Sequence, residues 1–567
     1  MESVATATLS LLRVFIQSIS SKMEGNLITK NYQQFEVVDD LGKLLHTFEG
    51  ATQANKALPG DAVKIESDGK VVLLARAAHP LLAGYLELNS KTTYGITKRK
   101  HPLYLFVPLN TAYPSFVVGS SESDRSCKKV VLVSFHSWDD GLPRGSLERI
   151  LGNAGELVAE DEALLWSACP YKSLTAGLEV LGDDCPDRKL VKGFSFNIDP
   201  EGCKDIDDCV TFDRLSEEEW CVTITISDVA SCVPEMEAVD LMAATLCQTL
   251  YRDGEAVRPM LPPFFSEDNC SLKAGTERRG VSLSFRWSHV YAWIGDVQWH
   301  ETTITNNETY TYDTVPELHG NLLQGCVIDI AKRFVSDPHE WIEVLMKFYN
   351  TEAAKLLRAA GIGILRRHSA PDLERLAKYS AWDAKLSTLA MSAAEYCLAD
   401  ASDVHHWGIA EGVYCHATSP IRRYADLMNQ RILKQLIRGN KEVMVTVFCS
   451  ELNESAKVAK GYERDRQFLK CLLGDGERTF GGRILDLEPQ EDGKVVVRIW
   501  ISAWGRTVKT RMRLVEPLKS DGLARVCSAD ETATFELREG QEIKFDCAMN
   551  LAGRRWKDRL VIQIKSE

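Results

Sequence analysis

Four aspartates are crowded into one short segment of the sequence, GFSFNIDPEGCKDIDDCVTF. They are Asp199, Asp205, Asp207 and Asp208. Carboxylates this close repel one another unless a cation neutralises them, and oxygen ligands of this kind select Mg²⁺ or Mn²⁺. Two such cations can activate a water and stabilise the leaving oxygen when a phosphodiester is hydrolysed. The cluster therefore indicates a catalytic metal site.

The residues around the aspartates indicate how the four side chains come together. Alternating apolar residues from Phe194 to Ile198 are typical of a half-buried strand that ends just before Asp199. The Asp-Pro pair at this point and Gly202 predict a tight loop, which can fold Asp199 back towards the later three. An acidic turn and a calcium loop are the alternatives. The spacing does not fit the calcium pattern, but spacing alone leaves the acidic turn open.

A second segment with chemical potential is SPIRRYADLMNQRILKQLIRG. Ser419 is a favoured helix cap and Pro420 a favoured first helical residue, so we expect a helix to begin there. Apolar residues at helical spacing leave Arg422 and Arg423 at the helix N-terminus, where backbone amides and the helix dipole favour an anion. The segment therefore predicts a phosphate site, with surface ion pairing as the alternative.

These segments resemble the ribonuclease II (RNB) family of 3′-to-5′ exoribonucleases. The family pattern IDP-x-x-x-x-D-x-DD is intact, and further similar segments follow in order: ISDVA from Ile226, RPMLPPFFSEDNCSL from Arg258, ILRRHSAP from Ile364 and CHATSPIRRYADLMNQRIL from Cys415. The resemblance covers about residues 192 to 472. The stretches PGDAV and RAAHPLLAGYL look more like the eukaryotic exosome-associated branch, here expected without its N-terminal endonuclease module.

The resemblance implies a hydrolase that degrades single-stranded RNA processively to nucleoside 5′-monophosphates. The four aspartates would hold Mg²⁺, or Mn²⁺, with two ions during catalysis. Asp207 and Arg422 would be catalytic, with Arg422 gripping the reacting phosphate.

The resemblance also implies RNA-binding roles for Arg423 and two further residues. Tyr251 would clamp the terminal base, although one extra residue before the MLP segment keeps a core tyrosine open as the alternative. Glu463 would orient Arg422 or a sugar hydroxyl. The chain has Gln430 where the family usually has His, and Thr225 where it often has His, which affects fine positioning rather than the reaction class.

Several domains are needed to position these segments, because 567 residues exceed one ordinary domain. We expect a multidomain α+β protein in which a central mixed α/β RNB nuclease domain is flanked by small OB-type β-barrels. We expect a tail or short helix over 1–24, a first barrel over 25–75 and a second barrel over 76–140. A connector over 141–189 follows, with a helix indicated by GSLERILGNAGELVAEDEALL. The nuclease domain is expected over 190–472 and a C-terminal barrel over 473–567. An apolar face from Ile342 to Ala360 predicts a long helix that Gly361 ends.

Two basic stretches outside the nuclease domain suit an RNA backbone. KTTYGITKRKH contains Lys98, Arg99 and Lys100. In the last segment, Trp504 precedes a basic stripe formed by Arg506, Lys509 and Arg511. This segment, from Cys471 on, has 17 basic and 16 acidic residues, so it lacks the excess of acidic residues that the whole chain has. An aromatic beside basic residues is typical of single-strand binding, with solvated loops and strand edges as the alternatives.

The composition sets limits on location and partners. The chain has no apolar run long enough to span a bilayer and no targeting signal, and its 16 cysteines show no CxxC pair. We therefore expect an intracellular, cytoplasmic protein with single-stranded RNA as partner, no membrane partner and unknown protein partners. The net charge of −13 does not exclude RNA, because local charge decides phosphate binding.

Two other functions compete with the exoribonuclease. A catalytically inactive RNB-fold protein could act as an RNA-binding regulator, because a fold does not guarantee its activity. A single-strand nucleic-acid chaperone would explain the barrels but not the aspartates. The intact aspartate set favours the enzyme.

Overall fold

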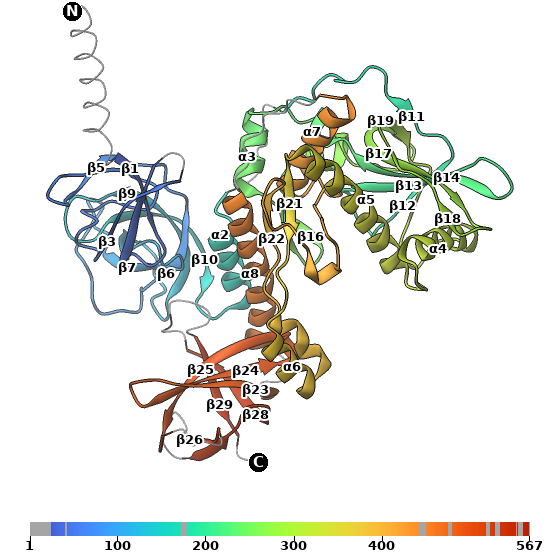
Figure 1. Cartoon of the computed structure of the whole chain (residues 1–567). Helices are drawn as coiled ribbons and strands as arrows, with labels where there is room; N and C mark the ends of the chain where they lie inside the picture. The colour runs from blue at the N-terminus through green and yellow to red at the C-terminus, as the bar shows by residue number, and fades with distance from the viewer. Residues whose placement is uncertain are drawn as a thin grey trace, which may run out of the picture. The chain divides into compact units, whose positions relative to one another are not determined.

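The computed structural model describes most of the chain as two compact units, Met1–Tyr171 with Arg464–Glu567, and Lys172–Glu463 (Figure 1). The described residues are 24–39, 42–171, 178–440, 449–474, 479–517, 522–527, 533–550, 553 and 559–565. The expected tail at 1–24 lies outside these ranges except for its last residue. Within them, no helix has both the length and the apolar character needed to cross a membrane.

The first unit begins with a five-stranded antiparallel sheet in the order β3-β2-β1-β4-β5. Its strands are β1 (Glu24–Thr29), β2 (Gln34–Val38), β3 (Leu44–Glu49), β4 (Ala62–Ile65) and β5 (Val71–Ala75). Alternate residues point inward, and the rings of Phe35 and Phe48 stack with centroids 4.9 Å apart. Period-two burial of this kind gives the sheet one core-facing side.

A closed barrel of five strands follows. The strands are β6 (Leu82–Leu86), β7 (Leu103–Pro108), β8 (Phe116–Gly119), β9 (Lys129–Ser137) and β10 (Arg144–Asn153), with α2 (Leu157–Ala168) after them. The predicted helix from residue 145 is therefore wrong over β10, and the expected barrel boundary at 140 falls too early. β10 pairs with β9 along its length and with β8 at one end. This pairing closes the barrel and overrides the local helical spacing.

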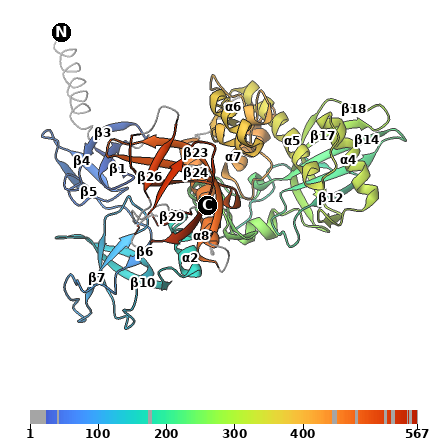
Figure 2. The same ribbon diagram turned by 90° about the horizontal axis from the view of Figure 1, so that it is seen from below.

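The C-terminal part of the first unit is a seven-stranded antiparallel sheet in the order β27-β26-β25-β24-β23-β28-β29 (Figure 2). Its strands are β23 (Thr479–Pro489), β24 (Lys494–Ile501), β25 (Arg506–Leu514), β26 (Ala524–Cys527), β27 (Thr534–Leu537), β28 (Glu542–Met549) and β29 (Leu560–Ile564). Just before β29, the buried Arg559 lies 3.5 Å from the Glu160 carboxylate of α2 and donates to the Tyr85 hydroxyl. Buried charges require such partners, so this contact fastens the C-terminal strand to the second barrel.

The second unit is built on a mixed eight-stranded sheet. Its strands are β11 (Lys189–Leu190), β12 (Phe194–Ile198), β13 (Asp208–Arg214), β14 (Glu219–Ser227), β17 (Glu277–Ser288), β18 (Trp293–Ile294), β19 (Gln298–Thr305) and β20 (Glu308–Tyr310). The longer helices of this unit are α3 (Ala238–Leu246), α4 (Glu317–Ala331), α5 (Pro338–Ala360), α6 (Leu373–Trp382), α7 (Tyr424–Ile437) and α8 (Cys449–Leu473), whose last residues belong to the first unit. Two small sheets complete it: the hairpin of β15 (Leu250–Arg252) with β16 (Glu255–Arg258), and the antiparallel pair of β21 (Ile364–Arg367) with β22 (Glu395–Leu398), between which α6 lies in the sequence.

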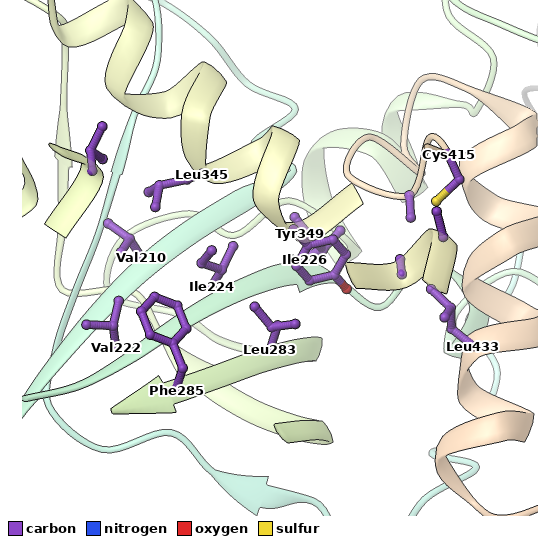
Figure 3. Packing of buried hydrophobic residues seen from close by; sticks show 14 of the residues in the cluster. Val210, Val222, Ile224, Ile226, Leu283, Phe285, Leu345, Tyr349, Cys415 and Leu433 are labelled. Carbon is purple, nitrogen blue, oxygen red and sulfur yellow. The ribbon is translucent and has the colours of Figure 1, made fainter. Parts of the chain in front are cut away.

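The core of the second unit lies between this sheet and α5 (Figure 3). Side chains of β14 and β17, such as Ile224 and Leu283, meet Leu345 and Tyr349 of α5. The predicted long helix is confirmed: α5 ends before Gly361, whose φ of 70° is left-handed and suits glycine.

The predicted start of α7 is wrong, because the helix begins at Tyr424 rather than after Ser419. Arg423 is extended and pairs with Gln248 in an isolated bridge, while the Arg422 carbonyl accepts the Thr249 amide at 3.0 Å. These bonds to a distant segment hold residues 422 and 423 out of the helix. The expected multidomain class is confirmed: small β domains, one of them a closed five-stranded barrel, accompany a larger mixed α/β domain.

Candidate active site

Asp199, Asp205 and Asp207 lie on the loop that joins β12 to β13, and Asp208 is the first residue of β13. The two strands are antiparallel, with Phe196 opposite Val210, so the loop returns to its starting edge. The Cys203 amide donates to the Pro200 carbonyl at 3.1 Å, and Gly202 adopts a φ of 80°. This is the predicted tight loop, and it brings Asp199 back beside Asp208.

Three of the four carboxylates have a specific protein partner. Asp207 is buried and accepts hydrogen bonds from the Ile421 amide at 3.1 Å and from Arg422 Nε at 3.3 Å. The Tyr251 hydroxyl donates to Asp205 Oδ2 at 2.9 Å. Asn197 Nδ2 donates to Asp199 Oδ2 at 2.8 Å. The structure thus joins the aspartate loop to both of the other predicted site elements.

The electrostatics of the loop favour a bound cation. Burial raises the pKa of Asp207 to about 7, although the positive charge of Arg422 opposes this shift. Burial and the negative charges of Asp199 and Asp207 raise the pKa of Asp208 well above its ordinary value. Burial is also the main cause that raises the pKa of Asp199. Carboxylates that are costly to ionise together become favourable ligands once a divalent cation neutralises them.

The tightest group of acidic residues lies elsewhere. Among the described residues, the one group with three ligand atoms all within 4.8 Å of one another is Asp184, Asp228 and Glu301. Three cationic side chains already neutralise it: Arg188 and Lys434 lie 2.8 Å from Asp228, and Arg438 lies 2.6 Å from Glu301. We assign this group as an ion-pair network. The all-oxygen aspartate loop, with one arginine against four carboxylates, fits Mg²⁺ or Mn²⁺ better.

The two arginines of SPIRRY have different environments. The Arg422 side chain is 43% exposed, and its Nη2 donates to Ser419 Oγ at 3.1 Å. Its guanidinium therefore borders both the aspartate loop and solvent. Arg423 instead donates to the fully buried Asp426 at 2.8 Å, within the first turn of α7. This ion pair gives Arg423 a structural partner, and its RNA-binding role stays a prediction.

One residue beside the loop was not predicted. The Asp199 amide donates to the carbonyl of Tyr310, two residues before Tyr312, at 3.0 Å. The negative charges of Asp199 and Asp208 add to burial in raising the pKa of Tyr312. Its ring stacks on His339, with centroids 3.8 Å apart. Tyr312 follows β20, which pairs with β12 in parallel. Only this long-range pairing signals its position, because more than a hundred residues separate it from the aspartates.

The remaining predicted RNA-binding residues are not joined to the loop by any contact among the described residues. Glu463 is an exposed residue of α8. The loop between β6 and β7 exposes Lys98, Arg99 and Lys100, and the outer face of β25 exposes Lys509 and Arg511. These side chains are accessible to a polyanion, so their RNA-binding roles stay predictions.

The predicted aromatic platform of the C-terminal barrel is wrong. Trp504 is 6% exposed and packs edge-on against Phe468 and Phe480, so its ring is a core residue. Arg506 beside it lies 2.7 Å from Asp465 and over the Phe468 ring. The three-residue turn at Ser502–Trp504 directs the indole inward, which sequence spacing does not reveal.

Comparisons with known proteins give matches in both the nuclease segment and the second barrel. The family model for the RNB domain matches residues 188–323 and 316–439, and the one for Dis3-like cold-shock domain 2 matches residues 103–168. Mouse exosome complex exonuclease RRP44 is 22% identical over 461 residues, covering 64% of this chain and 48% of that protein. Ribonuclease R of Helicobacter pylori is 26% identical over 375 residues, covering 51% and 57%. The chain spans about half the length of these curated relatives.

Two solved structures share the fold over almost the whole chain. RNase R of Mycoplasma genitalium, in complex with ribose methylated single-stranded RNA, superimposes with a TM-score of 0.69 at 17% identity, covering 96% of this chain and 100% of that chain. Yeast Ssd1, described as a pseudonuclease, has a TM-score of 0.59 at 14% identity, covering 97% and 98%. At these identities the likeness shows the fold alone.

Proposed function

Because the chain belongs to the ribonuclease II (RNB) family, we propose that it is a metal-dependent exoribonuclease, which degrades single-stranded RNA processively from its 3′ end to nucleoside 5′-monophosphates. The observation that carries the proposal is the contact between Asp207 and Arg422 on an intact set of four aspartates. A phosphate gripped by Arg422 would lie directly beside these carboxylates.

Each residue of the site has a separate role in the proposed reaction. Arg422 is partly exposed and already oriented by Ser419 and Asp207, so its fork can hold a phosphate with little reorganisation. Tyr251 presents its ring beside Asp205 and can hold the terminal base. Bound Mg²⁺ or Mn²⁺, most simply two ions held by the aspartates, would supply an activated water and stabilise the leaving oxygen.

The second candidate is an RNA-binding regulator without nuclease activity. The likeness to the yeast pseudonuclease Ssd1 favours it, because that protein shares the fold over 97% of this chain. Both candidates predict RNA as a partner, and the likeness to an RNase R solved with single-stranded RNA supports this. They differ in the aspartates, since a protein that only binds RNA has no need of four crowded carboxylates, one of them buried.

A degradation assay separates the two candidates. The full chain is incubated with 5′-labelled single-stranded RNA in Mg²⁺, in Mn²⁺ and in excess EDTA. We expect shortening of the labelled RNA from its 3′ end with either metal, release of nucleoside 5′-monophosphates, and no reaction in EDTA. RNA binding without any shortening, by protein that is folded and supplied with metal, would establish the regulator instead.

We also propose an intracellular, cytoplasmic location. It is supported by the state of the sixteen cysteines, all of which lie in the described ranges and none of which forms a disulfide there. Free thiols in this number suit a reducing compartment. Fractionation of cells that express the chain tests this, and recovery in a secreted fraction would contradict it.

A further inference from the structure

Gln430 of α7 is a buried residue whose amide uses both of its polar atoms. Only 1% of its surface is exposed. Its Nε2 donates to the Ser227 carbonyl at 2.7 Å, and its Oε1 accepts the Ala230 amide at 3.0 Å. Both partners are backbone groups at the end of β14 and in the turn after it. The side chain therefore holds this backbone at two points.

Ser227 connects Gln430 directly to the aspartate loop. The Ser227 amide donates to the Asp207 carbonyl at 2.8 Å, while its own carbonyl accepts from Gln430. The Ser227 hydroxyl is also fixed, because it donates to the Cys270 carbonyl at 2.5 Å. The amide, carbonyl and hydroxyl of Ser227 are all hydrogen-bonded in the closely packed interior. A shift of α7 would therefore move Ser227, and with it the backbone of Asp207.

The other end of this chain of contacts returns to the same aspartate. The turn before α7 supplies the Ile421 amide and Arg422 Nε, which hold the Asp207 side chain at 3.1 and 3.3 Å. Asp207 is thus held by its backbone through Ser227 and by its side chain through the turn before α7. Gln430 is the side chain of α7 that links this helix to Ser227, and through Ser227 to the Asp207 backbone.

We propose that Gln430 is a positioning residue of the active site, which sets the separation of Arg422 from Asp207 by anchoring α7 to Ser227. The inference rests on the proposed function, because the separation matters only if Arg422 holds the reacting phosphate. A reacting group displaced by as little as 1 Å can lose about a hundredfold in rate. A buried amide that fixes two elements with hydrogen bonds is suited to prevent such a displacement.

Lys434 supports the same arrangement one helical turn further on. Its Nζ lies 2.8 Å from the carboxylate of Asp228, the residue after Ser227. Residues four apart share one helix face, so this face of α7 docks on two consecutive residues of the strand end. Lys434 belongs to the ion-pair network and is expected to serve stability, whereas Gln430 contacts the residue that bonds Asp207.

Three variants of Gln430 test the proposal. Gln430→Met keeps the length but leaves the Ser227 carbonyl and the Ala230 amide unpaired. Gln430→Glu keeps an acceptor for Ala230 but sets a carboxylate oxygen against the Ser227 carbonyl. Gln430→His offers one N–H donor and one acceptor. We expect Gln430→Met and Gln430→Glu to lower the single-turnover rate at saturating RNA at least tenfold, while their RNA affinity stays within threefold of the parent. The single-turnover rate of Gln430→His should stay within fivefold of the parent.

Asn429 provides a matched control on the same helix. It is also a buried amide, which exchanges hydrogen bonds of 2.8 Å with the backbone of Ile364 on β21 and donates to the His416 carbonyl at 2.9 Å, and none of these partners is Ser227. Asn429→Leu should lower the melting temperature as much as Gln430→Met does, yet keep the single-turnover rate of the folded fraction. Equal rates for Gln430→Met and Asn429→Leu in an active parent would overturn the proposal.

Amide hydrogen exchange gives a second readout that does not need activity. Gln430→Met should speed exchange at Ala230, which loses its acceptor, and at Ser227, whose amide bonds Asp207. Asn429→Leu should change neither. If the parent chain does not hydrolyse RNA, the proposed function fails, but faster Ser227 exchange in Gln430→Met alone still supports the anchoring role. Unchanged Ser227 exchange in that variant contradicts the anchoring role whether or not the parent is active.

Discussion

Arg422 Nε lies 3.3 Å from Asp207 Oδ2, although 215 residues separate the two in the sequence. The contact joins the two motifs that carry the proposed chemistry. It also explains why the pKa of Asp207 rises no further on burial, because the guanidinium charge favours the ionised carboxylate. The site therefore presents an arginine that is oriented in advance and still open to a phosphate.

Replacement of Arg422 by lysine should slow the reaction far more than it weakens RNA binding. Lysine keeps the charge but cannot offer the two-pronged fork that holds a phosphate. Removing one such interaction from the transition state costs roughly 3 kcal/mol, or about a hundredfold in rate. Single-turnover hydrolysis measures this. Arg367→Lys, at a half-exposed arginine paired with Glu395, is the control and should leave the rate unchanged.

An Arg422→Lys enzyme with the parental single-turnover rate would remove Arg422 from the reacting phosphate. The contact with Asp207 would then be a structural ion pair.

Replacement of Tyr251 by alanine should change how the RNA end is held. Stacking of a base on an aromatic ring contributes roughly 1–3 kcal/mol, so affinity for short RNA should fall and the final undegraded fragment should change in length. Tyr251→Phe keeps the ring and loses only the hydrogen bond to Asp205. It should therefore retain the parental product length. If the alanine variant matches the parent in both measurements, Tyr251 is a core residue.

The basic loop between β6 and β7 should bind phosphates of the RNA backbone. Every ion pair with a phosphate that is removed makes the slope of log affinity against log salt shallower by about 0.7 for single strands. Changing Lys98, Arg99 and Lys100 together to glutamine should therefore reduce the slope by about 2, measured as RNA affinity at several salt concentrations. Hydrolysis of a very short oligonucleotide should keep its parental rate. An unchanged slope would show that this loop does not touch RNA.

Asp61 should make the first unit sensitive to acid. Burial alone would raise the pKa of Asp61, but the His79 ring 3.1 Å away, hydrogen bonds from the Leu58 and Ala77 amides, and the charge of Arg76 lower it overall. A carboxyl whose pKa is lower in the folded state stabilises the fold above its unfolded pKa of about 3.8 and loses this effect as the pH falls further.

Asp61→Asn should therefore lower the free energy of unfolding at pH 7 by roughly 3 kcal/mol, because Arg76 loses a buried partner. The difference between variant and parent should shrink below about pH 4, because the Asp61 carboxyl becomes protonated in the unfolded chain there while it stays ionised in the folded chain to lower pH. Thermal or denaturant unfolding at pH 7 and at pH 3 measures it. A difference that is the same at both values would show that the Asp61 charge is unimportant.

The sequence predicts those features of the site that depend on neighbouring residues. The aspartate loop follows from the Asp-Pro pair and Gly202, and the length of α5 follows from its apolar face and Gly361. Features that depend on distant pairing could not be predicted. Arg423 lies outside the helix because Gln248 pairs with it, and Tyr312 follows β20, which lies beside the strand that leads to Asp199.

β10 shows the same limit for the fold. Its apolar spacing is compatible with a helix, and only the closure of the barrel by β9 and β8 decides for a strand. Trp504 likewise has an aromatic side chain next to basic residues, yet the turn before β25 sends it into the core. Local sequence does not say which side of a turn a ring will occupy.

The most direct test of the metal-dependent chemistry is Asp207→Asn in the full chain, assayed on 5′-labelled single-stranded RNA with Mg²⁺. The amide keeps the shape of the side chain but removes a charge that the cation cluster requires. We predict RNA affinity within a few-fold of the parent and loss of nearly all shortening, while the parent shortens the RNA with Mg²⁺ and not in EDTA. Degradation by Asp207→Asn at the parental rate with Mg²⁺ would contradict a catalytic metal site on this loop.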